Sequence, residues 1–362
     1  MELRPGYKRT EVGVIPEEWE VTTVGDIASF SGGSQPPRST FKFSPAIGYI
    51  RLIQIRDYKS DDFATYIPEQ LASKRCSIKD IMIGRYGPPI FQILRGIEGA
   101  YNVALIKATP TSKVEHEYFY FLLKQDRLLH VIESLSKRSS GQTGIEMPAL
   151  KGFSVALPSP SEQRAIATAL SDVDALLAQL DRLIAKKRDI KQAAMQQLLT
   201  GKMRLPGFDG EWRKVSFGDI ARPRGSRIDP RRQGAQGFCI ELEHLESGTG
   251  RLSGSTAAGE GASLKTVFQA GDVLFGKLRA YLRKFWLADR PGVCSTEIWA
   301  LEPSPNVTTS GYLAQVVMGA PFIEAASNAH GTHMPRSDWH VVKNLETLLP
   351  PIEEQTAIAT LL

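Results

Sequence analysis

Arginine and lysine recur beside aromatic and small polar residues in several loop-like segments, and this pattern suits nucleic-acid binding. Such cations replace the counterions of phosphates, and arginine also donates two hydrogen bonds to the acceptor edge of guanine. Serine and glutamine suit base edges and the DNA backbone. We predict contacts to double-stranded DNA, although a solvated charged surface is the alternative for any single residue. The candidates are Arg38, Lys42, Arg85, Tyr86, Lys137, Arg138, Ser140 and Gln142, then Arg224, Arg227, Arg231, Arg232, Lys277, Arg279, Tyr281, His333 and Arg336.

Residue patterns for catalysis or metal binding are missing from the sequence. The segment 271–278 approaches a phosphate-binding loop, but Leu278 stands where a serine or threonine must hold magnesium. The six histidines have no metal-ligand spacing, and Cys76, Cys239 and Cys294 are too scattered for a zinc site or a disulfide framework. No dinucleotide fingerprint, amino-methyltransferase motif or nucleophile triad is present. We therefore expect a non-catalytic protein that binds no metal or cofactor itself.

Composition bounds the class of protein only loosely. The chain has 362 residues, with 44 Lys and Arg against 39 Asp and Glu, which is compatible with a nucleic-acid partner. No apolar run approaches the eighteen or so residues of a membrane span, and no apolar stretch follows the charged N-terminus. We therefore expect a cytoplasmic protein.

Much of the sequence occurs twice. Residues 19–28 return as residues 212–221, and residues 157–170 return as residues 349–362. A shift of about 190 residues is too long for a solenoid repeat, so it indicates two copies of one module. Two copies suit a target with two similar halves, such as DNA.

Each copy mixes short strands with helices, which predicts an α+β fold. Alternation predicts strands at Tyr49–Ile55 and Cys239–Leu245, and short apolar runs predict buried strands within residues 80–86 and 272–278. Helical spacing extends over Glu117–Leu135 and Gly311–Ala326. We therefore expect two similar mixed domains joined by the helix described next.

A long helix is predicted between the copies. Ser159 and Glu162 form a capping box around Pro160, and no glycine or proline follows until Gly201, which suits the position after the helix end. About 40 residues at 1.5 Å each make a rod roughly 60 Å long. The second copy begins the same helix near residue 350, and the sequence given ends at Leu362. We expect a first domain at residues 1–157, the long central helix at 158–205, a second domain at 206–349 and the start of a second long helix at 350–362.

The predicted helix carries an apolar stripe at heptad spacing. Such a stripe is typical of a coiled coil with another long helix, and it can also dock a partner protein. The alternative is a single helix lying on a globular domain. The residues expected in this packing are Ile166, Val173, Leu176, Leu180, Leu183 and Ile190.

Three segments resemble a known family. Residues 6–21 are similar to the N-terminus of the specificity subunit of type I restriction-modification enzymes, and residues 157–167 and 198–208 are similar to that family's central conserved region. The resemblance covers the whole chain in its order of variable domain, conserved helix, variable domain and helix start. The chain departs from the family in lacking most of a distal conserved helix.

The resemblance implies a function that the residues alone do not establish. Each variable domain would read one half of a bipartite DNA site, and two antiparallel conserved helices would set the spacing. Two methyltransferase subunits would methylate adenine with S-adenosylmethionine, while restriction subunits would use ATP and magnesium to translocate DNA. The alternative is a shortened paralogue or coiled-coil scaffold that self-associates through its long helix. A stand-alone DNA enzyme is disfavoured by the missing motifs.

Overall fold

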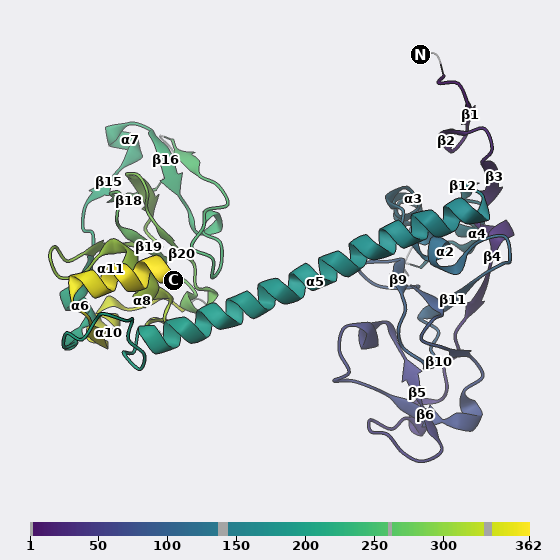
Figure 1. Cartoon of the computed structure of the whole chain (residues 1–362), viewed down its shortest axis with the longest axis horizontal. Coiled ribbons are helices and arrows are strands. Elements are labelled where there is room, and N and C mark those ends of the chain that lie inside the picture. Colours follow the sequence, from purple (N-terminus) through teal and green to yellow (C-terminus); the bar gives the residue numbers. More distant parts are fainter. Residues whose placement is uncertain (1–2, 137–143, 260–262, 329–334) are drawn as a thin grey trace. The chain divides into compact units, whose positions relative to one another are not determined.

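The computed structural model describes residues 3–136, 144–259, 263–328 and 335–362. The chain divides into two compact units, Met1–Leu180 and Asp181–Leu362. The division falls within the helix α5 (Pro160–Leu198), which follows the first unit's sheets in the chain and precedes those of the second (Figure 1). The α+β fold with a long central helix is therefore confirmed. Within the described residues, no helix is both long and apolar enough to cross a membrane.

The first unit contains two four-stranded sheets. One has the order β4 (Ala28–Gly32), β11 (Leu105–Pro110), β8 (Ile81–Gly84) and β9 (Gln92–Leu94). The other has the order β6 (Tyr66–Pro68), β5 (Tyr49–Ile53), β10 (Gly99–Tyr101) and β7 (Arg75–Cys76). The second sheet lies at the end of the unit away from the helices (Figure 1).

The remaining elements complete this unit and its core. A hairpin, β1 with β2, begins the chain, and β3 pairs with β12 beside α1. The buried face of the first sheet packs on α2, α3 and α4 through residues such as Ile83, Phe119 and Leu128. The bounds are β1 (Tyr7–Thr10), β2 (Gly13–Pro16), β3 (Glu20–Thr23), α1 (Val24–Ile27), η1 (Arg38–Thr40), η2 (Ile55–Tyr58), η3 (Glu69–Leu71), α2 (His116–Leu123), α3 (Asp126–Ser136), α4 (Met147–Lys151) and β12 (Ser154–Leu157).

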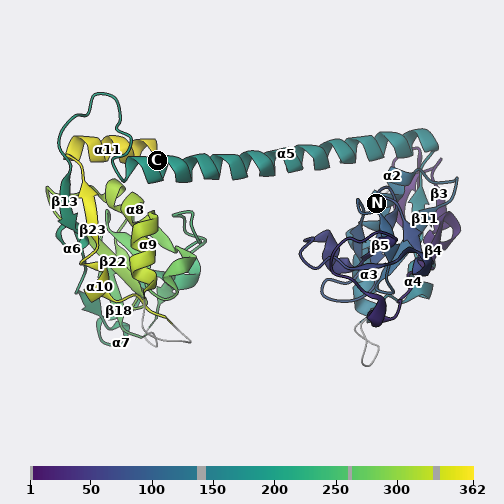
Figure 2. The same ribbon diagram turned by 90° about the horizontal axis from the view of Figure 1, so that it is seen from below.

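The second unit repeats this plan. Its helix-covered sheet has the order β14 (Ala221–Pro223), β22 (Ile298–Pro303), β19 (Val273–Gly276) and β20 (Phe285–Leu287). Its far sheet has the order β15 (Arg227–Ile228), β18 (Lys265–Phe268), β21 (Gly292–Ser295), β16 (Gln236–Ile240) and β17 (Thr256–Ala258). Figure 2 shows α8 and α9 beside β22. The other bounds are β13 (Arg213–Ser216), α6 (Phe217–Ile220), α7 (Pro230–Gln233), η4 (Leu242–His244), η5 (Ala280–Leu282), α8 (Ser310–Met318), α9 (Ala320–Ser327), α10 (Trp339–Val342), β23 (Glu346–Leu349) and α11 (Ile352–Leu361).

The repeat extends to single contacts. Capping boxes of the same form begin α1 at Thr23 and α6 at Ser216. An isolated β-bridge joins Tyr86 to Gly144 in the first unit, and another joins Leu278 to Arg336 in the second. Both partners of the second bridge lie 192 residues after those of the first. The duplication inferred from the sequence is therefore a duplication of tertiary structure.

Three element predictions were wrong in extent. The helix expected at Glu117–Leu135 is two helices, α2 and α3, and that at Gly311–Ala326 is broken at Gly319, because a proline in the first turn of α9 begins a new helix. The strand expected at Cys239–Leu245 ends at Ile240. There the Glu241 N–H donates to His244 Nδ1 (3.0 Å) instead of to a neighbouring strand.

Local signals place both ends of α5 correctly. The Ser159 N–H donates to Glu162 Oε2 (3.2 Å), the Glu162 N–H donates to Ser159 Oγ (3.4 Å), and Gly201 follows the helix with φ +68°. Ala167 is buried in the first unit's core and Leu198 in that of the second. Ile166 is partly buried, whereas residues 172–193 are exposed, including Val173 at 53% and Leu176 at 55%. Neither core covers this part of the stripe, and its pairing in a coiled coil stays a prediction.

Candidate nucleic-acid interface

The loop after β8 presents one predicted pair of DNA-binding residues in the first unit. The Arg85 guanidinium lies 5.3 Å from the centre of the Tyr86 ring, and the Arg85 N–H donates to Ala104 O (2.8 Å). Tyr86 also bridges to Gly144. The fold therefore brings the end of the segment that contains Lys137–Gln142 beside this loop. Lys137, Arg138, Ser140 and Gln142 themselves lie outside the described residues.

The equivalent loop after β19 gathers four predicted residues in the second unit. Lys277, Arg279 and Tyr281 follow the buried strand, and the bridge of Leu278 to Arg336 adds the segment from the other side. Tyr281 is 57% exposed. The Arg336 Nε lies 2.9 Å from Glu297 Oε2, and hydrogen bonding to this carboxylate raises the pKa of Arg336. His333 lies outside the described residues.

A second pair of equivalent segments carries basic residues near the far sheets. In the first unit, Arg38 is exposed in η1, and Lys42 Nζ lies 4.1 Å from the centre of the Tyr49 ring. In the second unit, exposed Arg231 and Arg232 lie in α7, with Arg231 Nε 2.9 Å from Asp229 Oδ1. Arg227 is exposed on β15. These positions fit phosphate contacts, and the role of each residue stays a prediction.

Arg224 is placed differently from the other candidates. Its guanidinium is bound by two carboxylates, Asp272, which is 1% exposed, and Glu302 at 3.1 Å. The hydrogen bond to Asp272 raises the pKa of Arg224 above its ordinary value. Because both acids neutralise this cation, Arg224 joins β14 to the turn before β19 and is a poor candidate for phosphate binding. The sequence shows only that residues 222–232 are rich in arginine, and it does not reveal that Asp272 and Glu302 pair with Arg224.

Two buried glutamines escaped the sequence analysis. The Gln163 side chain accepts the Glu115 N–H (2.8 Å) and donates to Pro158 O (2.9 Å). Gln355 does the same with Thr309 N–H (2.9 Å) and Pro350 O (2.9 Å). Each side chain joins the first turn of a helix, α5 or α11, to the loop before α2 or α8. The Glu-Gln pair common to both copies was the signal that could have found them.

An ion pair with a buried carboxylate joins the start of α11 to the segment that follows α5. Arg204 Nε lies 2.6 Å from Glu354 Oε1, and the Trp212 Nε1 donates to Glu354 Oε2 (2.9 Å). In the first unit, Trp19 Nε1 donates to Glu162 Oε1 at 3.4 Å. The segment after α5, which contains Arg204 and Trp212, is thereby attached to α11 in the second unit.

The described residues offer little chemistry for a reaction. No group of three or more His, Cys, Asp and Glu that could hold a metal ion occurs among them. Burial raises the pKa of the Cys76 and Cys239 thiols to about 11, which leaves both protonated at neutral pH. Exposed cations on paired loops are the dominant feature, and they fit binding to a polyanion.

Comparison with protein families identifies the class. Residues 16–187 match the type I restriction modification DNA specificity domain. Residues 16–187 therefore carry a domain of the kind found in type I restriction-modification specificity proteins. The match begins at the last residue of β2 and ends within α5, so it includes both four-stranded sheets of the first unit and much of the long helix.

Individual relatives point to one kind of protein. The specificity subunit of the EcoDI type I restriction enzyme of Escherichia coli is 26% identical over 68% of this chain and 61% of its own length. The MjaVIII specificity subunit of Methanocaldococcus jannaschii is 21% identical over 95% of this chain and 85% of its own. A putative specificity subunit of the latter organism, MjaX, is matched over 48% of its length. The chain thus spans about half to three fifths of two of these curated relatives.

Solved structures agree on the fold. The S subunit of a type I restriction-modification system from M. genitalium has a TM-score of 0.56 and 14% identity, covering 99% of this chain and 90% of the other. A chain from a type I restriction-modification assembly has a TM-score of 0.56 and 16% identity, covering 96% and 89%. These identities establish a common fold and nothing finer.

Proposed function

We propose that this chain is the sequence-specific DNA-recognition subunit of a type I restriction-modification complex. Each unit reads one half of a bipartite DNA site, and the chain itself catalyses no reaction. The observation that carries the proposal is the equivalent pair of basic loops, at Tyr86 and Gly144 and at Leu278 and Arg336. Two copies of one reading surface match a target that has two separated parts.

The long helix is the proposed spacer and docking element. Its exposed apolar residues need a covering partner, and a second helix together with methyltransferase subunits, two in number, fits that need. S-adenosylmethionine would bind to those subunits, and ATP and magnesium to restriction subunits with translocase activity. The complex would act on DNA in the cytoplasm.

Selection from a library of duplexes tests the proposal. The purified chain is incubated with randomised double-stranded DNA, and the retained sequences are read. We expect two short conserved blocks separated by a gap of fixed length and unspecified sequence. Retention without any enriched sequence, or a single uninterrupted block, would contradict recognition of a bipartite site.

The exposed stripe favours a second candidate, a shortened paralogue or scaffold that self-associates. Leu176, Leu180 and Leu183 are each close to half exposed, which is costly for an unpartnered helix. Sedimentation equilibrium of the chain alone would reveal a dimer. A dimer that is abolished by Leu180→Lys but shows no DNA selection would favour this alternative over the recognition subunit.

A further inference from the structure

The loop between β19 and β20 contains two arginines with strained backbones. Arg279 has φ +55° and Arg283 has φ +52°, so both adopt the left-handed conformation on either side of η5. For a residue with a side chain this conformation is unfavourable, and it persists only where neighbouring structure enforces it. Such residues concentrate at functional sites, which makes this loop the most informative segment of the second unit.

The start of the loop is held by the segment after residue 334. The Arg279 N–H donates to Pro335 O (3.0 Å), and the Ser337 N–H donates to Lys277 O (2.8 Å). Ser337 is buried and its hydroxyl also donates to Ala326 O (2.7 Å) in α9. Ala280 is buried in the unit's main core. The Arg279 backbone therefore has little freedom to relax.

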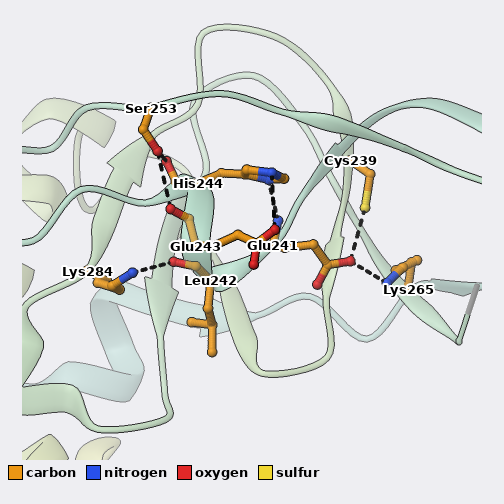
Figure 3. Close-up of polar contacts among 8 residues, drawn as sticks. All are labelled: Cys239, Glu241, Leu242, Glu243, His244, Ser253, Lys265 and Lys284. Carbon is orange, nitrogen blue, oxygen red and sulfur yellow. Dashed lines mark hydrogen bonds and ion pairs between the residues drawn. The ribbon is translucent and has the colours of Figure 1, made fainter. Parts of the chain in front are cut away.

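The end of the loop is held by η4 and by the segment that follows it. The Gly248 N–H donates to Arg283 O (2.9 Å), and Lys284 Nζ donates to Leu242 O (2.6 Å). Figure 3 shows this contact beside the network that fixes η4. In that network His244 accepts the Glu241 N–H, and the Glu241 carboxylate binds the buried Lys265 Nζ at 2.6 Å. Both ends of the loop are thus attached to rigid parts.

Between its two anchored ends, this loop carries exposed or partly exposed side chains that could contact a ligand. Arg279 is exposed, Tyr281 is 57% exposed and Arg283 is half-buried. Among the described residues, no hydrogen bond or ion pair engages the guanidinium of Arg279 or Arg283. Arg290, by comparison, is also exposed but binds Asp289 at 2.7 Å. Within the part of the chain that the structure describes, the loop therefore offers guanidinium donors without a partner at positions fixed by its backbone.

We infer that residues 277–284 form a preorganised base-reading loop, in which Arg279, assisted by Tyr281 and Arg283, recognises guanine in one half of the DNA site. This inference rests on the proposed function. Phosphates can be bound by flexible cations anywhere on a surface, whereas bidentate donation to guanine O6 and N7 requires a fixed approach. A loop ordered before binding loses less conformational entropy when it binds, and this favours accurate reading.

The test compares duplex selection by the full chain and by its variants. Arg279→Ala and Arg279→Gly both remove the guanidinium, but glycine keeps the left-handed backbone without strain. We expect both variants to lose base preference at one or two adjacent positions of one half-site. Affinity for the selected duplex should fall on the order of ten-fold to hundred-fold, as for one lost bidentate contact. Tyr281→Ala should weaken the same half-site, and the Arg290→Ala control should select the wild-type sequence.

Fluorescence anisotropy at several salt concentrations separates base reading from charge. An equal loss of affinity for selected and scrambled duplexes, with a smaller salt dependence, would make Arg279 a phosphate contact and overturn the inference. Unchanged base preference in Arg279→Gly, with wild-type selection intact, would overturn the inference and leave the proposed function standing. If the wild-type chain selects no sequence, the proposed function fails and the reading loop fails with it.

Discussion

At the scale of single residues, buried polar side chains decide how each helix begins on its module. Gln163 is 1% exposed and Gln355 is 0% exposed, and both bind backbone groups of two different segments. A backbone group left buried without a partner costs about 1–3 kcal/mol. These glutamines are therefore expected to matter more for stability than any of the exposed arginines.

Replacement of either glutamine should destabilise mainly its own unit. Gln355→Leu keeps the volume but leaves Thr309 N–H and Pro350 O unpaired, so the free energy of unfolding of the second unit should fall by a few kcal/mol, about 1–3 per unpaired group. Scanning calorimetry should show a lowered transition for that unit only, and Gln163→Leu should lower the other. The exposed Gln179→Leu is the matched control. Equal shifts of both transitions would contradict the expectation that each glutamine stabilises its own unit independently of the other.

Asp80 links stability to pH in the first unit. Burial acts to raise the pKa of Asp80, but hydrogen bonds from Lys107 and from the Ser77 backbone outweigh it and hold the pKa below its ordinary value. A depressed pKa contributes stability that is present above the unfolded value of about 3.9 and is lost as pH falls through the folded value.

Removal of Lys107 should weaken this dependence of stability on pH. In Lys107→Met, burial is opposed only by the Ser77 bonds, so the pKa of Asp80 should rise and the free energy of unfolding at pH 7 should fall by on the order of 1 kcal/mol. Urea unfolding between pH 3.5 and pH 7 gives the measurement. The variant should lose less stability than wild type on acidification, and the exposed Lys79→Met should behave as wild type. A parallel shift at every pH would assign Lys107 a packing role alone.

At the scale of elements, α5 is the clearest product of local sequence. Its capping box, its uninterrupted run of helix-forming residues and its terminal glycine all act within a few residues, so they operate without tertiary help. Its exposed apolar stripe, by contrast, can be buried only when another helix or protein packs on it. The helix is thus locally determined in length and dependent on other chains or segments for its packing.

An insertion into this helix tests its role as a spacer. Four residues added near Ala185 lengthen an α-helix by about 6 Å and rotate its far end by about 40°. Because DNA rises about 3.4 Å per base pair, the gap between half-sites should change by about two base pairs. Duplex selection, or methylation mapping in a reconstituted complex, reads the gap. An unaltered gap in a folded variant would show that α5 does not set the spacing.

At the scale of the whole molecule, duplication explains the architecture. Each unit has its own hydrophobic core and its own pair of sheets. The equivalent bridges at Tyr86 and Leu278 place basic loops at corresponding positions in the two units. Under the proposed function, a protein built in this way can change one DNA-reading surface without altering the other.

Exchange of one module tests this independence. Replacing residues 206–349 with the corresponding domain of another family member should change only one half of the selected DNA sequence. The other half should remain as in wild type, because the first unit's loops are untouched. Selection with the chimaera supplies the readout, and the reciprocal exchange of residues 1–157 is the control. A change in both halves would mean that the two units read DNA jointly.

Sequence alone determined the features that depend on neighbours along the chain or on direct repetition. These include the bounds of α5, the buried strands β8 and β19, the duplicated module and the resemblance to specificity subunits. Tertiary structure alone decided which basic residues are available. The charge of Arg224 is neutralised by Asp272, which lies 48 residues away in the chain. The backbone of Arg279, by contrast, is fixed by a hydrogen bond from its N–H to Pro335 O in a different segment. Contacts between distant segments follow from packing and backbone hydrogen bonding. Neither produces a regular spacing of residues that could be recognised in the sequence.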